Sequence, residues 1–208
     1  MANNSSYEKY YGKIGVIDFH NDKKQLILSY IIRIICIPFF GSLFVLIALK
    51  IDVNIPVTKE AFLGIAIPGL SPFFSILFII MAIILILYLH ELIHSSIFFF
   101  SKGQKPRIGM KGLVIYAKAP KHLVNRNTMI VNGLAPFFVL TLLGFILIAL
   151  LPLPALPWIF IPTLVNAVAA GGDFMIVMWM LGHTRKTLYK DEGDIITAFS
   201  PLNVHNLN

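Results

Sequence analysis

The sequence of 208 residues has a single cysteine, Cys36, and little charge: only 13% of its residues are charged, and 10 are Asp or Glu. One cysteine excludes an intramolecular disulfide and a metal site made of several thiolates. We interpret Cys36 as a small buried hydrophobic residue. Because 57% of the residues are hydrophobic, the scarcity of charge is atypical of a soluble globular domain and indicates a membrane protein.

Other common signals are also absent from the sequence. The first 24 residues lack the short apolar core and cleavage site of a removable signal peptide, so we expect the first apolar segment to be an uncleaved anchor. Although the net charge is +7, no basic stripe is interleaved with aromatic residues, and we expect no nucleic-acid partner. There is no internal repeat, and the polar segments are too short for a second folded unit, so we predict one domain over residues 1–208.

Long apolar stretches dominate what remains. At about 1.5 Å per helical residue, each is long enough to cross a hydrocarbon layer of roughly 30 Å. The stretches cover residues 26–51, 72–101, 128–153 and 156–181. We therefore predict an all-α integral membrane fold with four transmembrane helices. The connection from 102 to 127 contains the alternating stretch RIGMKGLVIYAKAP, which predicts a short β-hairpin between the second and third helices.

The distribution of lysine and arginine predicts the orientation of these helices. Four lysines precede the first span, seven basic residues lie in the 102–127 connection, and three follow the last span. The loop between the first and second spans has one basic residue well inside it, and the loop between the third and fourth has none. By the positive-inside rule, both termini and the 102–127 connection lie in the cytoplasm.

Five ionisable residues lie within the predicted spans, away from their ends: Arg33, His90, Glu91, His94 and Asp173. Charge at this depth is costly, so these residues are the first functional candidates. Three of them form the sequence HELIH. Residues four apart share a helix face, so His90 and His94 can bind one tetrahedral metal ion. This is the zincin arrangement, in which the intervening Glu91 acts as general base toward zinc-bound water.

A catalytic zinc site usually has a third protein ligand, and Asp173 is the remaining carboxylate within a span. It follows an Ala-Ala-Gly-Gly run, which allows close helix packing. His90 and His94 precede Lys102 by 12 and 8 residues, and Asp173 precedes Gly182 by 9. These separations place the three side chains at a similar depth, roughly 12 to 18 Å from the cytoplasmic helix ends. We therefore predict that Asp173 completes the metal site.

Other interpretations of the polar residues in the spans are also open. The HELIH cluster could be a buried hydrogen-bonded group without metal, and Asp173 could pair with Arg33 or face a water-filled cavity. Asn166 shares the helix face of Asp173 and is a candidate catalytic residue that orients substrate or stabilises an oxyanion. It could equally be an interhelical contact. We interpret Asn132 as packing between helices and Arg33 as reaching toward the membrane surface.

Three motifs carry a resemblance over most of the chain from the second span onward: HELIH, LAPFF and a distal GGD. They resemble the zincin metallopeptidase family of small bacterial membrane proteins and, more distantly, the site-2 proteases, which cleave membrane-associated substrates. The resemblance implies that His90, Glu91 and His94 form the histidine-glutamate motif and that Asp173 takes the role of the distal aspartate. The distal segment NAVAAGGDF lacks the prolines and the following glycine of the site-2 motif.

The sequence thus predicts a membrane-embedded zinc metallopeptidase that hydrolyses peptide bonds of membrane-associated substrates, with Zn²⁺ as cofactor. The expected partners are a peptide or transmembrane substrate and the lipid bilayer. The resemblance implies a multi-pass protein of the bacterial plasma membrane. The alternative is a membrane metal-binding or transport protein, or a scaffold, that uses the same ligands without hydrolysis. A transporter would be expected to show inverted repeats, which the sequence lacks.

Overall fold

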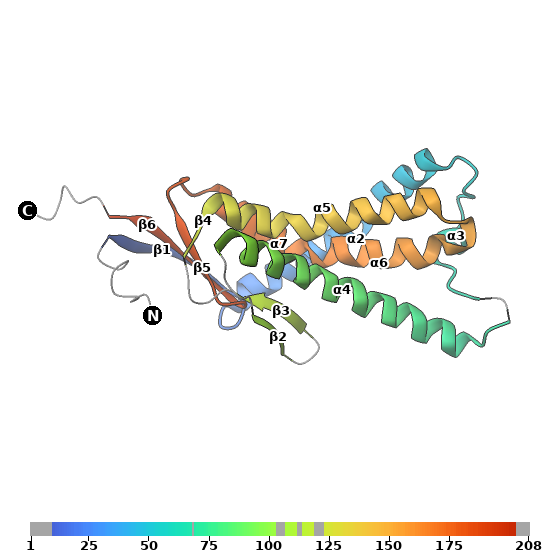
Figure 1. Ribbon diagram of the computed structural model, residues 1–208, viewed down its shortest axis with the longest axis horizontal. Coiled ribbons are helices and arrows are strands. Elements are labelled where there is room, and N and C mark those ends of the chain that lie inside the picture. The colour runs from blue at the N-terminus through green and yellow to red at the C-terminus, as the bar shows by residue number, and fades with distance from the viewer. Residues whose placement is uncertain (1–9, 68, 103–106, 112–113, 119–122, 203–208) are drawn as a thin grey trace, which may run out of the picture.

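The computed structural model describes residues 10–67, 69–102, 107–111, 114–118 and 123–202. It is an elongated helical bundle with a small β-sheet at one end, beside both chain termini (Figure 1). The bundle consists of α2 (Lys23–Ile51), α4 (Pro72–Lys102), α5 (Arg126–Leu150), and the consecutive helices α6 (Leu156–Ala169) and α7 (Gly171–Leu181). The short helix α3 (Lys59–Leu63) and the 3-10 turn η1 (Leu153–Ala155) lie at the opposite end.

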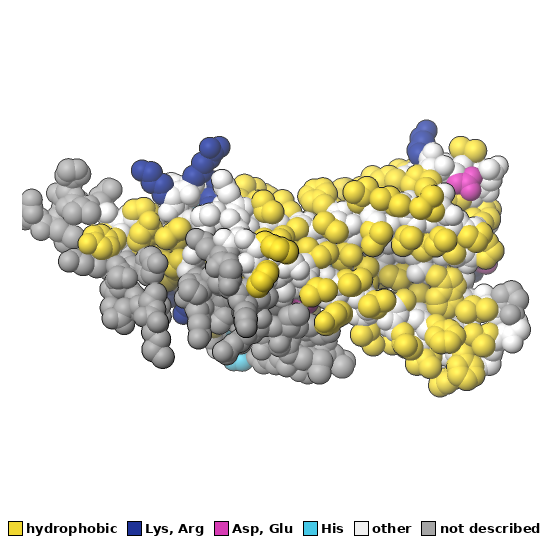
Figure 2. Space-filling view, in the orientation of Figure 1, with side chains coloured by type: hydrophobic (Ala, Val, Ile, Leu, Met, Phe, Trp, Pro, Cys, Tyr) yellow, Lys and Arg dark blue, Asp and Glu magenta, His cyan; other side chains and the backbone are white. Residues whose placement is uncertain are grey.

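The described residues include four helical segments long and apolar enough to cross a membrane. They are Lys23–Ile51, Pro72–Ser101, Arg126–Leu150 and Leu153–Leu181, with a mean hydropathy between 1.7 and 2.8. The predicted long apolar helices are therefore confirmed. Their large exposed hydrophobic side chains cover the helical body, whereas lysine and arginine side chains gather toward its ends (Figure 2).

The expected all-α class is wrong in one respect, because the chain also forms a four-stranded antiparallel sheet. Its strand order is β1-β6-β5-β4. The strands are β1 (Tyr11–Asp18), β4 (Val124–Asn125), β5 (Leu188–Asp191) and β6 (Ile195–Pro201). None of these four strands was predicted from the sequence. Strand pairing between the two ends of the chain leaves no local pattern in the sequence, which is why these strands were missed.

The predicted hairpin between the second and third long helices is present. Strands β2 (Arg107–Lys111) and β3 (Val114–Lys118) pair antiparallel, and they lie beside the end of α4 that is nearer the sheet (Figure 1). The rest of the predicted connection, at 103–106, 112–113 and 119–122, lies outside the described residues.

The first turn of α5 links the sheet to the bundle. Asn125, the last residue of β4, caps this helix because its side-chain oxygen accepts a hydrogen bond from the Thr128 amide at 2.8 Å. The next residue, Arg126, donates through Nε to the carbonyl of Met180 at 2.8 Å and through Nη2 to that of Leu181 at 3.1 Å. These carbonyls end α7, so Arg126 fixes α7 against α5. The two helices carry groups of the site described next.

Candidate metal centre

Two buried histidines face one point from a single turn of α4. His90 and His94 are four residues apart, so their side chains leave the same helix face. They are 4% and 8% exposed, and their Nε2 atoms lie 3.2 Å apart. Buried imidazoles in an apolar helix need hydrogen-bond partners, and each ring receives one through its other nitrogen.

The partner of His94 is the backbone of α5. Nδ1 of His94 lies 2.9 Å from the carbonyl oxygen of Asn132. This carbonyl is available because Pro136, four residues later, has no N–H to donate to it within the helix. The proline of the LAPFF motif therefore exposes the acceptor that orients His94.

The partner of His90 is the side chain of Asn166 on α6. The Asn166 side chain is fully buried, and its Oδ1 lies 2.9 Å from His90 Nδ1. Its Nδ2 donates to the carbonyl of Pro136 at 3.4 Å, which fixes the orientation of the amide. Both polar atoms of Asn166 are thus used inside the protein. This contact makes Asn166 a residue that orients His90.

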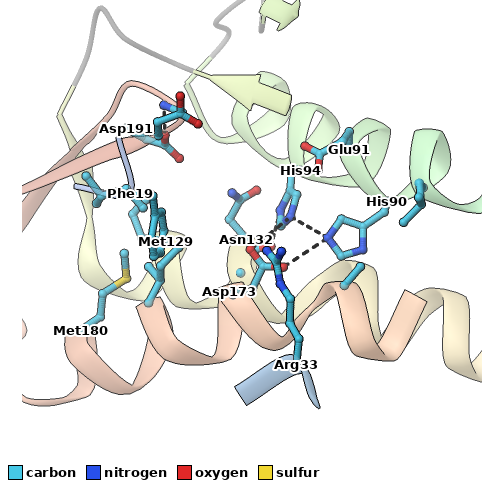
Figure 3. A pocket seen from close by; sticks show the side chains of 18 of the residues that line it. Phe19, Arg33, His90, Glu91, His94, Met129, Asn132, Asp173, Met180 and Asp191 are labelled. Carbon is cyan, nitrogen blue, oxygen red and sulfur yellow. Dashed lines mark hydrogen bonds and ion pairs between the residues drawn. The ribbon is translucent and has the colours of Figure 1, made fainter. Parts of the chain in front are cut away.

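These contacts determine which nitrogens point into the site. Each Nδ1 donates to an oxygen, so in the neutral imidazoles both Nε2 atoms keep a lone pair. Asp173 meets the same point: its Oδ2 lies 3.2 Å from Nε2 of His90, and its Oδ1 lies 3.7 Å from Nε2 of His94. Three bases at this distance repel one another unless a proton or a metal ion lies between them. The sequence-predicted residues are brought together (Figure 3).

The separations also suit a tetrahedral zinc site. Ligands about 2.05 Å from zinc lie about 3.3 Å from one another, close to the observed 3.2, 3.2 and 3.7 Å. Two imidazole nitrogens and one carboxylate oxygen are a common donor set of catalytic zinc, in which the fourth position stays open. In zinc-binding histidines, the imidazole nitrogen that does not bind the metal usually donates a hydrogen bond to an oxygen, as both Nδ1 atoms do here. The residues present therefore fit Zn²⁺.

Glu91 reaches the same site from the side of α4. His90, Glu91 and His94 each have one possible ligand atom in this group, and the three atoms lie within 4.8 Å of one another. Because Glu91 follows His90 directly, its side chain leaves the helix at a different angle and lies above the imidazoles (Figure 3). A carboxylate beside these imidazoles could exchange a proton with a water molecule.

Asp173 lies in the first turn of α7, just after α6 ends. Two glycines precede it and contact Arg33 of α2. A Cβ atom on Gly171 would lie 2.9 Å from Arg33 Cγ, and one on Gly172 would lie 2.9 Å from Arg33 Nη2. A side chain at Gly171 would meet the stem and backbone of Arg33, whereas one at Gly172 would have to displace the end of the Arg33 side chain. The small residues were expected to let helices approach, and the neighbour that they admit is an arginine.

A cavity of about 390 Å³ contains the site, a size typical of small-ligand pockets. Its wall includes all four residues of the predicted zincin set, together with Arg33 and Asn132. The buried Oδ1 of Asn132 has no hydrogen-bond partner. Toward the sheet, the wall is made by Phe19 and by the turn between β5 and β6 (Figure 3).

Asp191 is the cavity residue that the sequence analysis missed. It is 8% exposed and lies at the end of β5, where it accepts a hydrogen bond from the Gly193 amide at 2.8 Å. Burial raises the pKa of the Asp191 carboxyl from 3.8 to about 7, although this hydrogen bond opposes the shift. No motif marks this residue, because it stands in a polar segment with other acidic residues nearby in sequence.

The fold and the site together define a mostly helical protein with a zincin-type HExxH motif on a long apolar helix. The family model described as "Putative zincin peptidase" matches residues 83–189, just over half of the chain. The chain belongs to this family. No curated protein and no solved structure matches it.

Proposed function

We propose that this protein is a membrane-embedded zinc metallopeptidase that hydrolyses peptide bonds of membrane-associated polypeptides. His90, His94 and Asp173 hold the metal, and Glu91 is the general base. The observation that carries the proposal is the convergence of two Nε2 lone pairs and one carboxylate, with distances of 3.2 to 3.7 Å between their atoms. Zn²⁺ is the cation that family membership implies.

The two carboxylates have different positions and so different proposed roles. Asp173 faces both Nε2 atoms at distances close to the edges of a zinc tetrahedron. Glu91 is the sequence neighbour of a ligand and lies to one side of the ring pair. We therefore assign Asp173 as the third ligand and Glu91 as the base.

The metal and the side chains have separate roles in the proposed reaction. When bound, Zn²⁺ supplies a Lewis acid that polarises the scissile carbonyl and increases the acidity of water. Glu91 removes a proton from the attacking water and returns it to the leaving amine. Asn166 and the Asn132 carbonyl hold the two imidazoles in the orientation that exposes Nε2. Asn166 is on this proposal a positioning residue.

The sheet supports the proposed orientation in the bilayer. Strand β1 precedes the first long helix, β4 lies between the second and third, and β6 follows the last. Hydrogen bonds join all of these strands into one sheet through β5. If the four helical segments cross the membrane, the sheet requires both chain ends and the 102–125 connection to lie on one side. The lysine and arginine distribution favours the cytoplasm as that side, and the resemblance to small bacterial membrane proteins implies the bacterial plasma membrane.

The decisive experiment compares Glu91→Gln with wild type, both purified in detergent. Zinc content is measured by elemental analysis, and turnover with fluorescein-labelled casein. We expect the variant to keep its zinc and lose at least 100-fold in turnover, because the proton acceptor is removed. Glu60→Gln, an exposed position at the far end of the bundle, is the control and should match wild type.

Two results would contradict the proposal. If purified wild type contained no zinc, the proposal of a zinc site would be wrong. Zinc-loaded wild type without cleavage of any polypeptide would favour the transport or scaffold alternative.

A further inference from the structure

Arg33 is the basic residue that faces the proposed zinc site. It stands in α2, ten residues after the helix begins, and lines the cavity that contains His90, Glu91 and Asp173. Its side chain extends from α2 toward Asp173 (Figure 3). This position is not the one expected from the sequence, in which Arg33 reaches toward the membrane surface.

Within the described part of the chain, the guanidinium group has no carboxylate partner. Among the described residues, no ion pair within 4 Å involves Arg33, because the oxygens of neighbouring Asp173 face the two imidazoles. Its Nε is buried and has no hydrogen-bond partner. Leaving a buried donor of a charged group unpaired costs free energy, and at membrane depth the cost increases. Because Arg33 also lines the cavity, negative charge that develops there can become the partner of its guanidinium.

Neighbouring residues lie close to Arg33 on two sides. A Cβ atom on Gly171 would lie 2.9 Å from Cγ in the stem of Arg33, and one on Gly172 would lie 2.9 Å from Nη2 of its guanidinium. On another side, Cζ lies 5.7 Å from the centre of the Tyr30 ring, a cation-π contact. A guanidinium in the wall of the cavity that contains His90, His94 and Asp173 is placed to stabilise negative charge that develops there.

We infer that Arg33 is a further catalytic residue, whose guanidinium donates hydrogen bonds to the oxyanion formed when water adds to the scissile carbonyl. This inference rests on the proposed peptidase function. In the step, the water oxygen bonds to the carbonyl carbon, Glu91 accepts the water proton, and the carbonyl electron pair moves onto its oxygen. That negatively charged oxygen accepts hydrogen bonds from the Arg33 guanidinium. Collapse restores the carbonyl, breaks the C–N bond, and Glu91 returns its proton to the nitrogen.

The test uses full-length protein in detergent and a fluorogenic peptide copied from the casein bond that wild type cleaves fastest. Arg33→Met should lower kcat about 100-fold, the usual effect of losing one oxyanion donor, with KM changed less than threefold. Inhibition by a phosphonamidate peptide of the same sequence, which presents a tetrahedral anion, should weaken by a similar factor. Arg33→Lys should restore part of kcat and part of the phosphonamidate inhibition. Zinc content should stay at the wild-type value in each variant.

Gly172→Ala provides a second variant that keeps the arginine. The new methyl group meets Nη2 and displaces the guanidinium, so kcat should fall and phosphonamidate inhibition should weaken with zinc retained. Should Arg33→Met fail to fold, this variant decides. Gly41→Ala is the matched control on α2, because its nearest neighbouring atom would be 4.0 Å away.

The results separate this inference from the function on which it rests. If wild type cleaves casein and Arg33→Met raises KM alone, Arg33 binds a group of the bound substrate and the inference is wrong. Unchanged kcat and unchanged phosphonamidate inhibition would also overturn it. If wild type cleaved no polypeptide, both the proposed peptidase function and the role of Arg33 as oxyanion donor would be wrong.

Discussion

Asn166 on α6 holds His90 on α4 through a buried hydrogen bond of 2.9 Å, across 76 residues of sequence. We expect Asn166→Leu to lower zinc affinity about 10- to 100-fold, because His90 loses the acceptor that fixes its ring. Asn166→Asp keeps an acceptor at this position and should lose less affinity. Competition with a chromophoric chelator measures both values. Equal affinity in wild type and Asn166→Leu would show that this bond does not orient a ligand.

Pro136 affects the other imidazole through the backbone. Replacing it by alanine supplies an N–H that can bond the Asn132 carbonyl within α5 and compete with His94. We expect Pro136→Ala to weaken zinc binding about tenfold while the helix itself becomes more regular. Pro38→Ala is the control, because Pro38 is also inside a long helix but has an exposed side chain. If both variants bind zinc like wild type, the freed carbonyl has no effect on the site.

Asp173 and Glu91 are predicted to differ when each is removed. Asp173→Ala should lose zinc during purification, because only two protein ligands remain, whereas Glu91→Gln should retain it. Elemental analysis after passage over a chelating resin measures the ratio of zinc to protein. The opposite pattern, with zinc retained by Asp173→Ala and lost by Glu91→Gln, would exchange the roles of the two carboxylates.

Asp191 should make the stability of the metal-free protein depend on pH. The folded protein raises the pKa of this carboxyl from 3.8 to about 7, so the folded state binds the extra proton between these values. The stabilisation is present below pH 3.8 and is lost as pH rises through 7, at about 1.4 kcal/mol for each unit of pKa difference. Asp191→Asn keeps an oxygen for the Gly193 amide and removes the titration.

The measurement is thermal unfolding of EDTA-treated protein at pH 5 and pH 8. Wild type should lose more stability between these pH values than Asp191→Asn does. Parallel pH dependence in the two proteins would contradict the assignment, since other titrating groups are common to both.

Much of the candidate site could be predicted because the positions of its side chains follow from helix geometry. The four-residue spacing places His90 and His94 on one face, and counting residues from the helix ends places Asp173 at the same depth. The structure brings the three side chains to one point. Their role as metal ligands stays a prediction that the experiments above test.

The contacts around the ligands could not be predicted in the same way. Whether Asn166 faces a substrate or His90 depends on the rotation of α6 against α4, which sequence spacing does not give. The Gly171–Gly172 pair indicated close packing, but nothing in the sequence shows that the partner is Arg33. The strands near the chain ends were missed because β1 and β6 are separated by nearly the whole chain.

The pairing of β1 with β6 sets an order of assembly during synthesis. The turn after β5 and the start of β6 form one wall of the cavity, so a nascent chain that still lacks Ile195–Pro201 lacks part of that wall. Because β1 is synthesised before β6, the edge of β1 that pairs with β6 stays unpaired until β6 has been made. A chain without β6 would therefore leave the cavity open on the side of the sheet.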